Sequence, residues 1–166
     1  IRDRGNTRKT LWTESYEIEE LPQVIQPKSG YFYNANHTPF KSSAEEDNPD
    51  PTNFDSNMGF ETYDNNRSTR LKQLIDEYEK LDYDDFKRIK YDRQYPRPYT
   101  FNWMDIHYLE LLDAKKYPDI EMLIERLQAW DREANKNSFG AGTFAVLYDQ
   151  LRPFYSKIPE PKIFPA

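Results

Sequence analysis

Two asparagines, Asn34 and Asn36, have the residue type and spacing best suited to chemistry in this sequence. A side-chain amide donates hydrogen bonds without carrying a charge, which suits it to stabilising an oxyanion. A strand-like run at 31–33 precedes them, and residues at i and i+2 of an extended segment point to the same side. Pro39 ends that run because proline cannot donate to a ladder. The alternative is that both amides only bond a neighbouring turn, and on chemistry alone this second interpretation is favoured.

The longer segment around these asparagines carries a more specific signal. Residues 20–39 read E-L-P-Q-V-I-Q-P-K-S-G-Y-F-Y-N-A-N-H-T-P. This string resembles the β chain of the penicillin amidase (penicillin acylase) family, whose pattern is L-P, a short spacer, then N-P-x-x-G-Y-x-x-N-x-N-N-x-P. Those proteins are N-terminal-nucleophile amidohydrolases and include acyl-homoserine-lactone acylases. Gln26 replaces the first asparagine of the pattern here, and His37 stands where asparagine or aspartate is usual.

The resemblance implies three site residues. The oxyanion-hole donor of the family, the second asparagine of N-x-N, falls on Asn36. The next catalytic-site residue is an arginine that opens the following helix, and it falls on Arg67 in R-S-T-R-L-K-Q-L-I, with Arg70 as the competing choice. An aspartate that binds a structural calcium falls on Asp47, eleven residues past the oxyanion asparagine. No cofactor is implied for the chemistry itself.

The catalytic nucleophile is expected outside this chain. The sequence has no G-x-S-x-G and only two histidines, so it lacks a nucleophile with a base. Members of the family use the first residue of the β chain, usually serine, and Ile1 cannot fill that role. The chain is therefore expected to be an internal β-chain segment that is inactive alone. Its expected partners are the rest of its precursor (the α chain and the N-terminal part of the β chain) and a small-molecule acyl amide. The family likeness places it in the periplasm or outside the cell.

Composition excludes several other classes. The net charge is −6, from 23 basic and 29 acidic residues, and Lys41–Asn66 alone holds one basic residue against seven acidic ones. No basic stripe tracks phosphates, so nucleic-acid binding is disfavoured. No apolar run approaches the ~20 residues of a membrane helix. The absence of cysteine excludes disulfides and zinc–sulfur sites.

The elements expected from the pattern are those of an α+β segment. Alternation at 11–24 and the run at 31–36 predict two strands within residues 1–40. Residues 41–66 are expected to form an acidic loop, residues 67–155 a helical part, and residues 156–166 an extended tail. The resemblance implies that this single segment is a fragment of an αββα sandwich.

Apolar spacing predicts about five helices in the helical part. The expected caps are Asn65, Asn66 or Ser68 for the first helix, Asp82 for the second and Thr100 for the third. The expected buried residues, helix by helix, are Leu71, Leu74, Ile75 and Tyr78; Phe86 and Ile89; Met104, His107, Tyr108, Leu111 and Leu112; Ile120, Leu123, Ile124, Leu127 and Trp130; and Phe144, Leu147, Tyr148 and Leu151.

A second hypothesis is a non-catalytic module. The chain is acidic and holds 13 tyrosines, and such a helical domain could bind glycans or proteins outside the cell by stacking on aromatic rings. Many of these aromatics lie at core spacing in the expected helices, however, and a generic binding module has no need of the ordered string at 20–39. The amidohydrolase hypothesis is therefore favoured.

Overall fold

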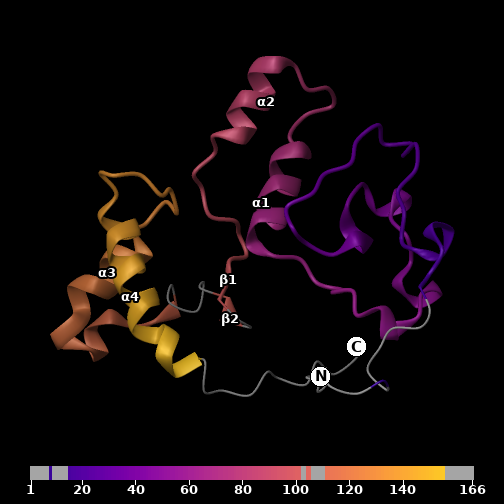
Figure 1. Cartoon of the computed structure of the whole chain (residues 1–166). Helices are drawn as coiled ribbons and strands as arrows, with labels where there is room; N and C mark the ends of the chain where they lie inside the picture. Colours follow the sequence, from indigo (N-terminus) through magenta and orange to yellow (C-terminus); the bar gives the residue numbers. More distant parts are fainter. Residues whose placement is uncertain (1–7, 9–14, 102–103, 106–110, 156–166) are drawn as a thin grey trace. The chain divides into compact units, whose positions relative to one another are not determined.

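Four α-helices and one pair of short strands are the main regular elements of the described residues. The computed structural model describes residue 8 and residues 15–101, 104–105 and 111–155 (Figure 1). The helices are α1 (Asn66–Ile75), α2 (Tyr83–Lys90), α3 (Glu121–Gln128) and α4 (Phe139–Tyr155). Strands β1 (Thr100–Phe101) and β2 (Met104–Asp105) pair antiparallel, with Thr100 opposite Asp105 and Phe101 opposite Met104. The mostly helical character expected of the segment is confirmed for the described residues.

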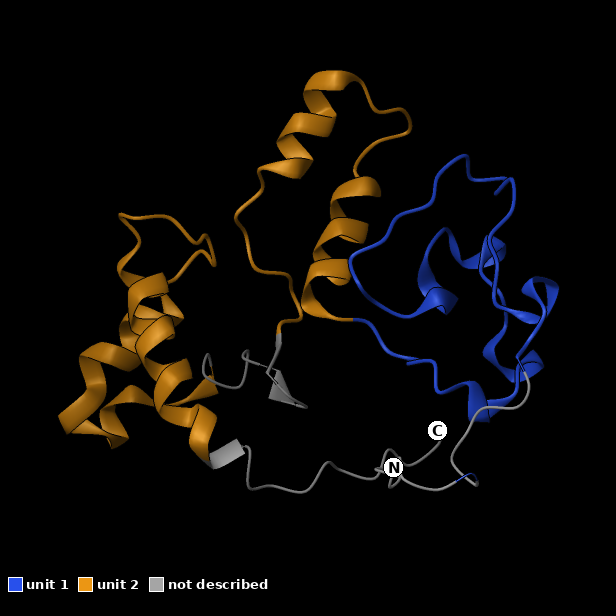
Figure 2. Cartoon of the chain, viewed as in Figure 1, with its two compact units in different colours: residues 1–64 blue, residues 65–166 orange. Residues whose placement is uncertain are grey.

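The chain divides into two compact units, residues 1–64 and residues 65–166 (Figure 2). In the described part of the first unit no residue lies in a strand, and the backbone instead makes the short 3-10 turns Ile18–Glu20, Pro39–Lys41, Glu45–Asp47, Pro51–Asn53 and Ser56–Met58. The predicted strands are therefore wrong for residues 15–24 and 31–36, and residues 11–14 lie outside the described residues. The structure thus gives no support to a sandwich from these segments.

Local side-chain bonds explain why these segments do not form strands. The Glu17 amide donates to the Glu20 carboxylate at 2.8 Å and the Asn36 amide to the Asn34 side chain at 2.8 Å, so backbone groups that a ladder would use are already satisfied. The first unit packs instead around Phe40, whose ring lies 5.6 Å from that of Phe54 and 6.2 Å from that of Phe60.

The predicted caps of α1 and α2 are confirmed. The Asn65 side chain accepts the Ser68 amide at 2.9 Å, and the Ser68 hydroxyl accepts the Asn65 amide at 3.0 Å. Asp82 and Asp85 repeat this reciprocal capping box at the start of α2. Phe86 was predicted to be buried, but it is exposed. The buried face of α2 contains Asp85 and half-buried Ile89, which are four residues apart and therefore on the same side of the helix. Phe86 is the next residue after Asp85 and lies on a different side.

The helix predicted from Thr100 is wrong for residues 100–101 and 104–105, which pair as strands β1 and β2. Pro96 and Pro98 precede a β-branched and an aromatic residue here, a combination that favours a strand over a helix start. His107 and Tyr108 lie outside the described residues. Leu111 and Leu112, expected to be buried, are exposed.

The core of the second unit is an aromatic cluster around Trp130 and Phe144. Their rings stack with centroids 5.2 Å apart, and Tyr95 and Tyr99 pack edge-on against Phe144 at 5.7 and 5.6 Å. Gly140 makes this contact possible, since a Cβ at that position would lie 2.4 Å from Cβ of Trp130. The close approach of α4 to Trp130 thus requires a residue without a side chain.

The apolar faces of α3 and α4 are only partly covered. Ile124 is buried and Leu127 is half-buried, as expected. Ile120, Leu123 and Tyr148 were also predicted to be in the core, but all three are exposed. The predicted helical spacing was correct, but α3 and α4 bury only part of their apolar faces against each other.

Candidate functional site

Asn34 and Asn36 lie in a tight turn at the surface of the first unit. Asn36 has a left-handed backbone with φ of 53°, a conformation that asparagine tolerates better than most residues. The side-chain oxygen of Asn34 accepts the backbone amide of Asn36 at 2.8 Å. Both side chains are exposed. The extended geometry expected for the pair is thus replaced by an Asx turn, which is the role considered as the alternative from sequence, and Asn34 is the residue that forms it.

His37 fastens the far end of this turn. Its Nδ1 lies 3.1 Å from the Ala35 amide and accepts that hydrogen, so Nε2 carries the proton that it donates to the Lys41 carbonyl at 2.9 Å. The ring also stacks on Tyr33, with centroids 4.9 Å apart. The histidine that departs from the family pattern therefore has a structural role: it fixes the turn that carries Asn36.

Two further bonds close the loop that holds the turn. The Tyr33 amide donates to the Ser42 carbonyl at 2.8 Å, and the buried Ser43 hydroxyl donates to the Tyr31 carbonyl at 2.7 Å. Thr38 is almost fully buried, and its hydroxyl accepts the Phe40 amide and so caps the 3-10 turn Pro39–Lys41. The backbone on both sides of Asn36 is therefore held by local bonds, without a sheet.

Asp47 binds the turn at 27–30. One carboxylate oxygen accepts the Lys28 amide at 2.9 Å and the other accepts the Ser29 amide at 2.8 Å. Gly30 closes the turn with φ of 78°, donating to the Pro27 carbonyl at 3.0 Å. The hydrogen bonds from Ser29 hold the pKa of Asp47 below its usual value.

This geometry does not by itself form a calcium site. Calcium takes six to eight oxygen ligands. Within the part of the chain that the structure describes, no three residues of the types His, Cys, Asp and Glu gather as a metal-binding group. Both Asp47 oxygens already accept amides, and the calcium expected at Asp47 stays a prediction.

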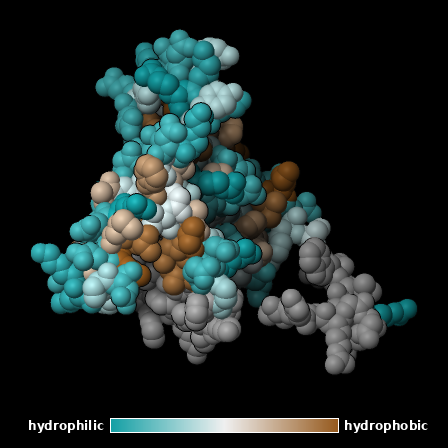
Figure 3. All heavy atoms as spheres, turned by 90° about the vertical axis from the view of Figure 1, so that its left-hand side faces the viewer, coloured by the Kyte–Doolittle hydropathy of each residue, from teal (hydrophilic) through white to brown (hydrophobic). Residues whose placement is uncertain are grey.

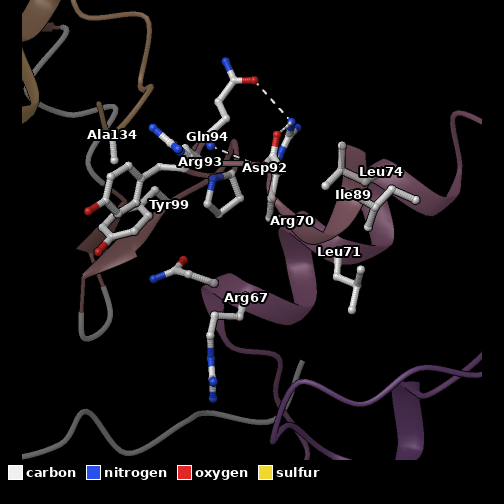
Figure 4. A pocket seen from close by; sticks show the side chains of 13 residues that line it. Arg67, Arg70, Leu71, Leu74, Ile89, Asp92, Arg93, Gln94, Tyr99 and Ala134 are labelled. Atoms are coloured by element: carbon white, nitrogen blue, oxygen red, sulfur yellow. Dashed lines mark hydrogen bonds and ion pairs between the residues drawn. The ribbon is translucent and has the colours of Figure 1, made fainter. Parts of the chain in front are cut away.

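The two arginines considered for the site differ in their surroundings. Arg70 makes a two-pronged bond to Asp92, at 2.8 Å from Nε and 2.7 Å from Nη2, and Nη2 also donates to Gln94 at 3.2 Å. These bonds raise the pKa of Arg70 and lower that of Asp92. Figure 4 shows Arg67 directed away from this group. Arg67 is exposed, and its guanidinium forms no hydrogen bond or ion pair with a described residue.

The dipole of helix α1 does not stabilise the charge of Arg67. This residue lies in the first turn of α1, where the positive end of the helix dipole disfavours a cation. This effect is small for an exposed side chain, so it does not by itself distinguish a catalytic-site arginine from an ordinary surface cation at a helix start. Arg70 is committed to Asp92, and the choice of Arg67 for the site stays a prediction.

Both arginines line a pocket of about 420 Å³ in the second unit (Figure 4). Its apolar side includes Leu71, Leu74 and Tyr99. Burial raises the pKa of Tyr99 to about 12, so this hydroxyl stays protonated at neutral pH. Sequence reasoning missed the Arg70–Asp92–Gln94 group, because the partners are more than twenty residues apart and no local spacing signals them.

Comparison with known proteins decides the family. The family model described as Penicillin amidase matches residues 3–161. The chain belongs to the penicillin amidase family. No solved structure matches it. Membership of the penicillin amidase family makes the chain part of an amidohydrolase family, whose members are hydrolases that act on amides. Among the described residues, no helix is long and apolar enough to cross a membrane.

Proposed function

We propose that this chain is an internal β-chain segment of an enzyme that hydrolyses acyl amides of the penicillin or N-acyl-homoserine-lactone type. The nucleophile would be the N-terminal residue of the β chain, supplied by the rest of the precursor. In this proposal Asn36 donates to the oxygen that gains charge as the acyl carbon becomes tetrahedral. Arg67 is kept as the catalytic-site arginine that the family resemblance implies. A periplasmic or secreted location and a structural calcium at Asp47 stay predictions.

The observation that carries the proposal is the turn from Asn34 to His37. It presents Asn36 at the surface on a backbone fixed by Asn34 and by both nitrogens of His37. A donor on a fixed backbone needs little rearrangement when charge appears on the substrate, and such preorganisation is the main source of oxyanion stabilisation. The side-chain amide of Asn36 is also uncharged, so it does not bind an anion from solution before the substrate arrives.

The structure determines which variants test Asn36. Alanine tolerates a left-handed backbone less well than asparagine does, so Asn36→Ala would mix added strain with the lost donor. Asn36→Gly removes the amide and keeps the backbone unstrained. Asn36→Asp keeps the shape but cannot donate when ionised. These two variants therefore separate the donor from the turn.

The assay is steady-state hydrolysis of chromogenic acyl amides by the mature enzyme assembled from the full precursor. Losing one oxyanion donor typically costs ~10²–10³ in kcat, so both variants should fall by that order with KM nearly unchanged. Precursor cleavage is checked first by gel, because autocleavage would use the same donor. Asn34→Ala tests the turn separately: it should lower thermal stability through the lost turn bond, and it should lower kcat by less than the loss of the Asn36 amide itself.

Two outcomes would refute the proposal. One is a folded, fully cleaved Asn36→Gly enzyme with wild-type kcat. The other is turnover by residues 1–166 alone that a point substitution within the chain abolishes, since this would place the nucleophile inside the segment.

A further inference from the structure

An apolar groove runs between α3 and α4 in the second unit. It encloses about 630 Å³, within the range of ~300–1,000 Å³ that is typical of small-molecule sites. Its walls include Ile120, Leu123, Leu127, Phe139 and Val146. Figure 3 shows apolar side chains gathered on the side of the molecule that carries these two helices. The core of the unit does not use this surface, since Leu123, Phe139 and Val146 are exposed.

A single charged side chain lines the described walls of this groove. Arg126 lies in the last turn of α3, with its guanidinium 5.7 Å from the centre of the Phe139 ring. No carboxylate of the described residues forms an ion pair with it. The remaining lining residues are apolar or neutral, among them Ser138, Thr143 and Gln150. The groove thus combines a long apolar wall with one unneutralised positive charge.

This combination matches an amphiphile with one anionic end. We infer that the α3–α4 groove binds a free long-chain monocarboxylate, with its alkyl chain along the apolar wall and its carboxylate at Arg126. The guanidinium fork fits a carboxylate in two-pronged geometry. A second copy of the chain fits less well, because a two-fold interface would set the same cation-bearing surface against itself. The inference does not depend on the proposed catalytic function.

Gly142 provides the variant that tests the site without disturbing the fold. It lines the groove from α4, and a Cβ added there meets no atom within 4 Å. Gly142→Leu should therefore fill the groove and leave the helices in place. Gly142→Ala is the matched control, since it makes the same backbone change with one methyl group. Circular dichroism and thermal melting confirm that both variants are folded.

The experiment is isothermal titration calorimetry of residues 1–166 with octanoate, decanoate and dodecanoate, each below its micelle concentration. Burial of each added methylene should tighten Kd by about fourfold, or about fifteenfold per step of the series. Gly142→Leu should abolish binding, while Gly142→Ala should keep it. Arg126→Gln should weaken dodecanoate binding by about threefold, as expected for an exposed ion pair, and leave dodecanol binding unchanged.

Three results would overturn the inference. The first is the absence of binding to any of the three acids in the folded wild-type chain. The second is equal binding by wild type and Gly142→Leu, which would place the ligand elsewhere. The third is a wild-type dimer in analytical ultracentrifugation that Gly142→Leu disrupts, which would make the groove an interface between copies.

Discussion

Gly140→Ala is the substitution whose outcome follows most directly from the structure. The new Cβ would lie 2.4 Å from Cβ, 2.4 Å from Cγ and 2.5 Å from Cδ1 of Trp130. Cβ of Trp130 is fixed by its own backbone, so the indole cannot rotate out of the way. Helix α4 must move instead, and its movement separates Phe144 from the Trp130 ring that it stacks on.

Two opposing effects set the magnitude. Alanine is favoured over glycine in a helix by about 1 kcal/mol. Overpacking a core usually costs about 1–3 kcal/mol, and the upper end applies here because the clash is with atoms close to the backbone. The net loss in the free energy of unfolding should be about 2 kcal/mol. For a chain of this length that lowers Tm by roughly 4–8 °C.

The assay is thermal and urea unfolding followed by tryptophan fluorescence. Gly142→Ala is the internal control: it lies in the same helix with open space around it, so it should raise stability by up to about 1 kcal/mol. If Gly140→Ala is as stable as the wild type, or gains as much as Gly142→Ala, the close packing of α4 on Trp130 is wrong.

Three more predictions concern ionisable groups. Asp92→Asn should lower the free energy of unfolding by about 1–3 kcal/mol at neutral pH. Because Arg70 lowers the pKa of Asp92, the difference in stability between variant and wild type should shrink as the pH falls through that pKa. A difference in urea unfolding that does not depend on pH would contradict this prediction. Asp47→Ala should destabilise the turn at 27–30 at neutral pH, and this effect should disappear in acid because the folded-state pKa of Asp47 is lowered. If a chelator lowers the Tm of the wild type but not that of Asp47→Ala, Asp47 binds calcium. The pKa of Tyr99 is raised to about 12, so its contribution to stability is complete below the ordinary tyrosine pKa of about 10 and is lost as the pH rises through 12. An absorbance titration should show one phenol that ionises at higher pH than ordinary tyrosines, and Tyr99→Phe should remove that step.

The sequence predicted well those features that depend on neighbouring residues. The caps at Asn65 and Asp82 need only a short polar side chain and a free amide three residues later. The turn at 27–30 needs a proline and a glycine, and both are present. The helical spacing of residues 121–128 and 139–155 was also correct. Each of these features is set within four or five residues of chain.

The failures lie where the outcome depends on distant partners or on competing local bonds. A strand forms only beside another strand, and spacing alone could not show that side chains at Glu20 and Asn34 would bind the backbone first. Burial of Phe86 and Leu123 depended on elements that do not cover them. At the candidate site, the string at 20–39 located Asn36, but its left-handed backbone could not be read from spacing.

The division into two units has a consequence for how the chain responds to ions in solution. The unit of residues 1–64 holds six of the 23 basic residues and twelve of the 29 acidic ones, so it carries the entire net charge of −6. The unit of residues 65–166 is electrically balanced. Self-repulsion that salt can screen is therefore concentrated in the unit that presents Asn36. Raising the ionic strength from low values should stabilise the unit of residues 1–64 and leave the stability of the aromatic core around Trp130 nearly unchanged. The two units should therefore differ in how much stability they lose in a buffer of low ionic strength.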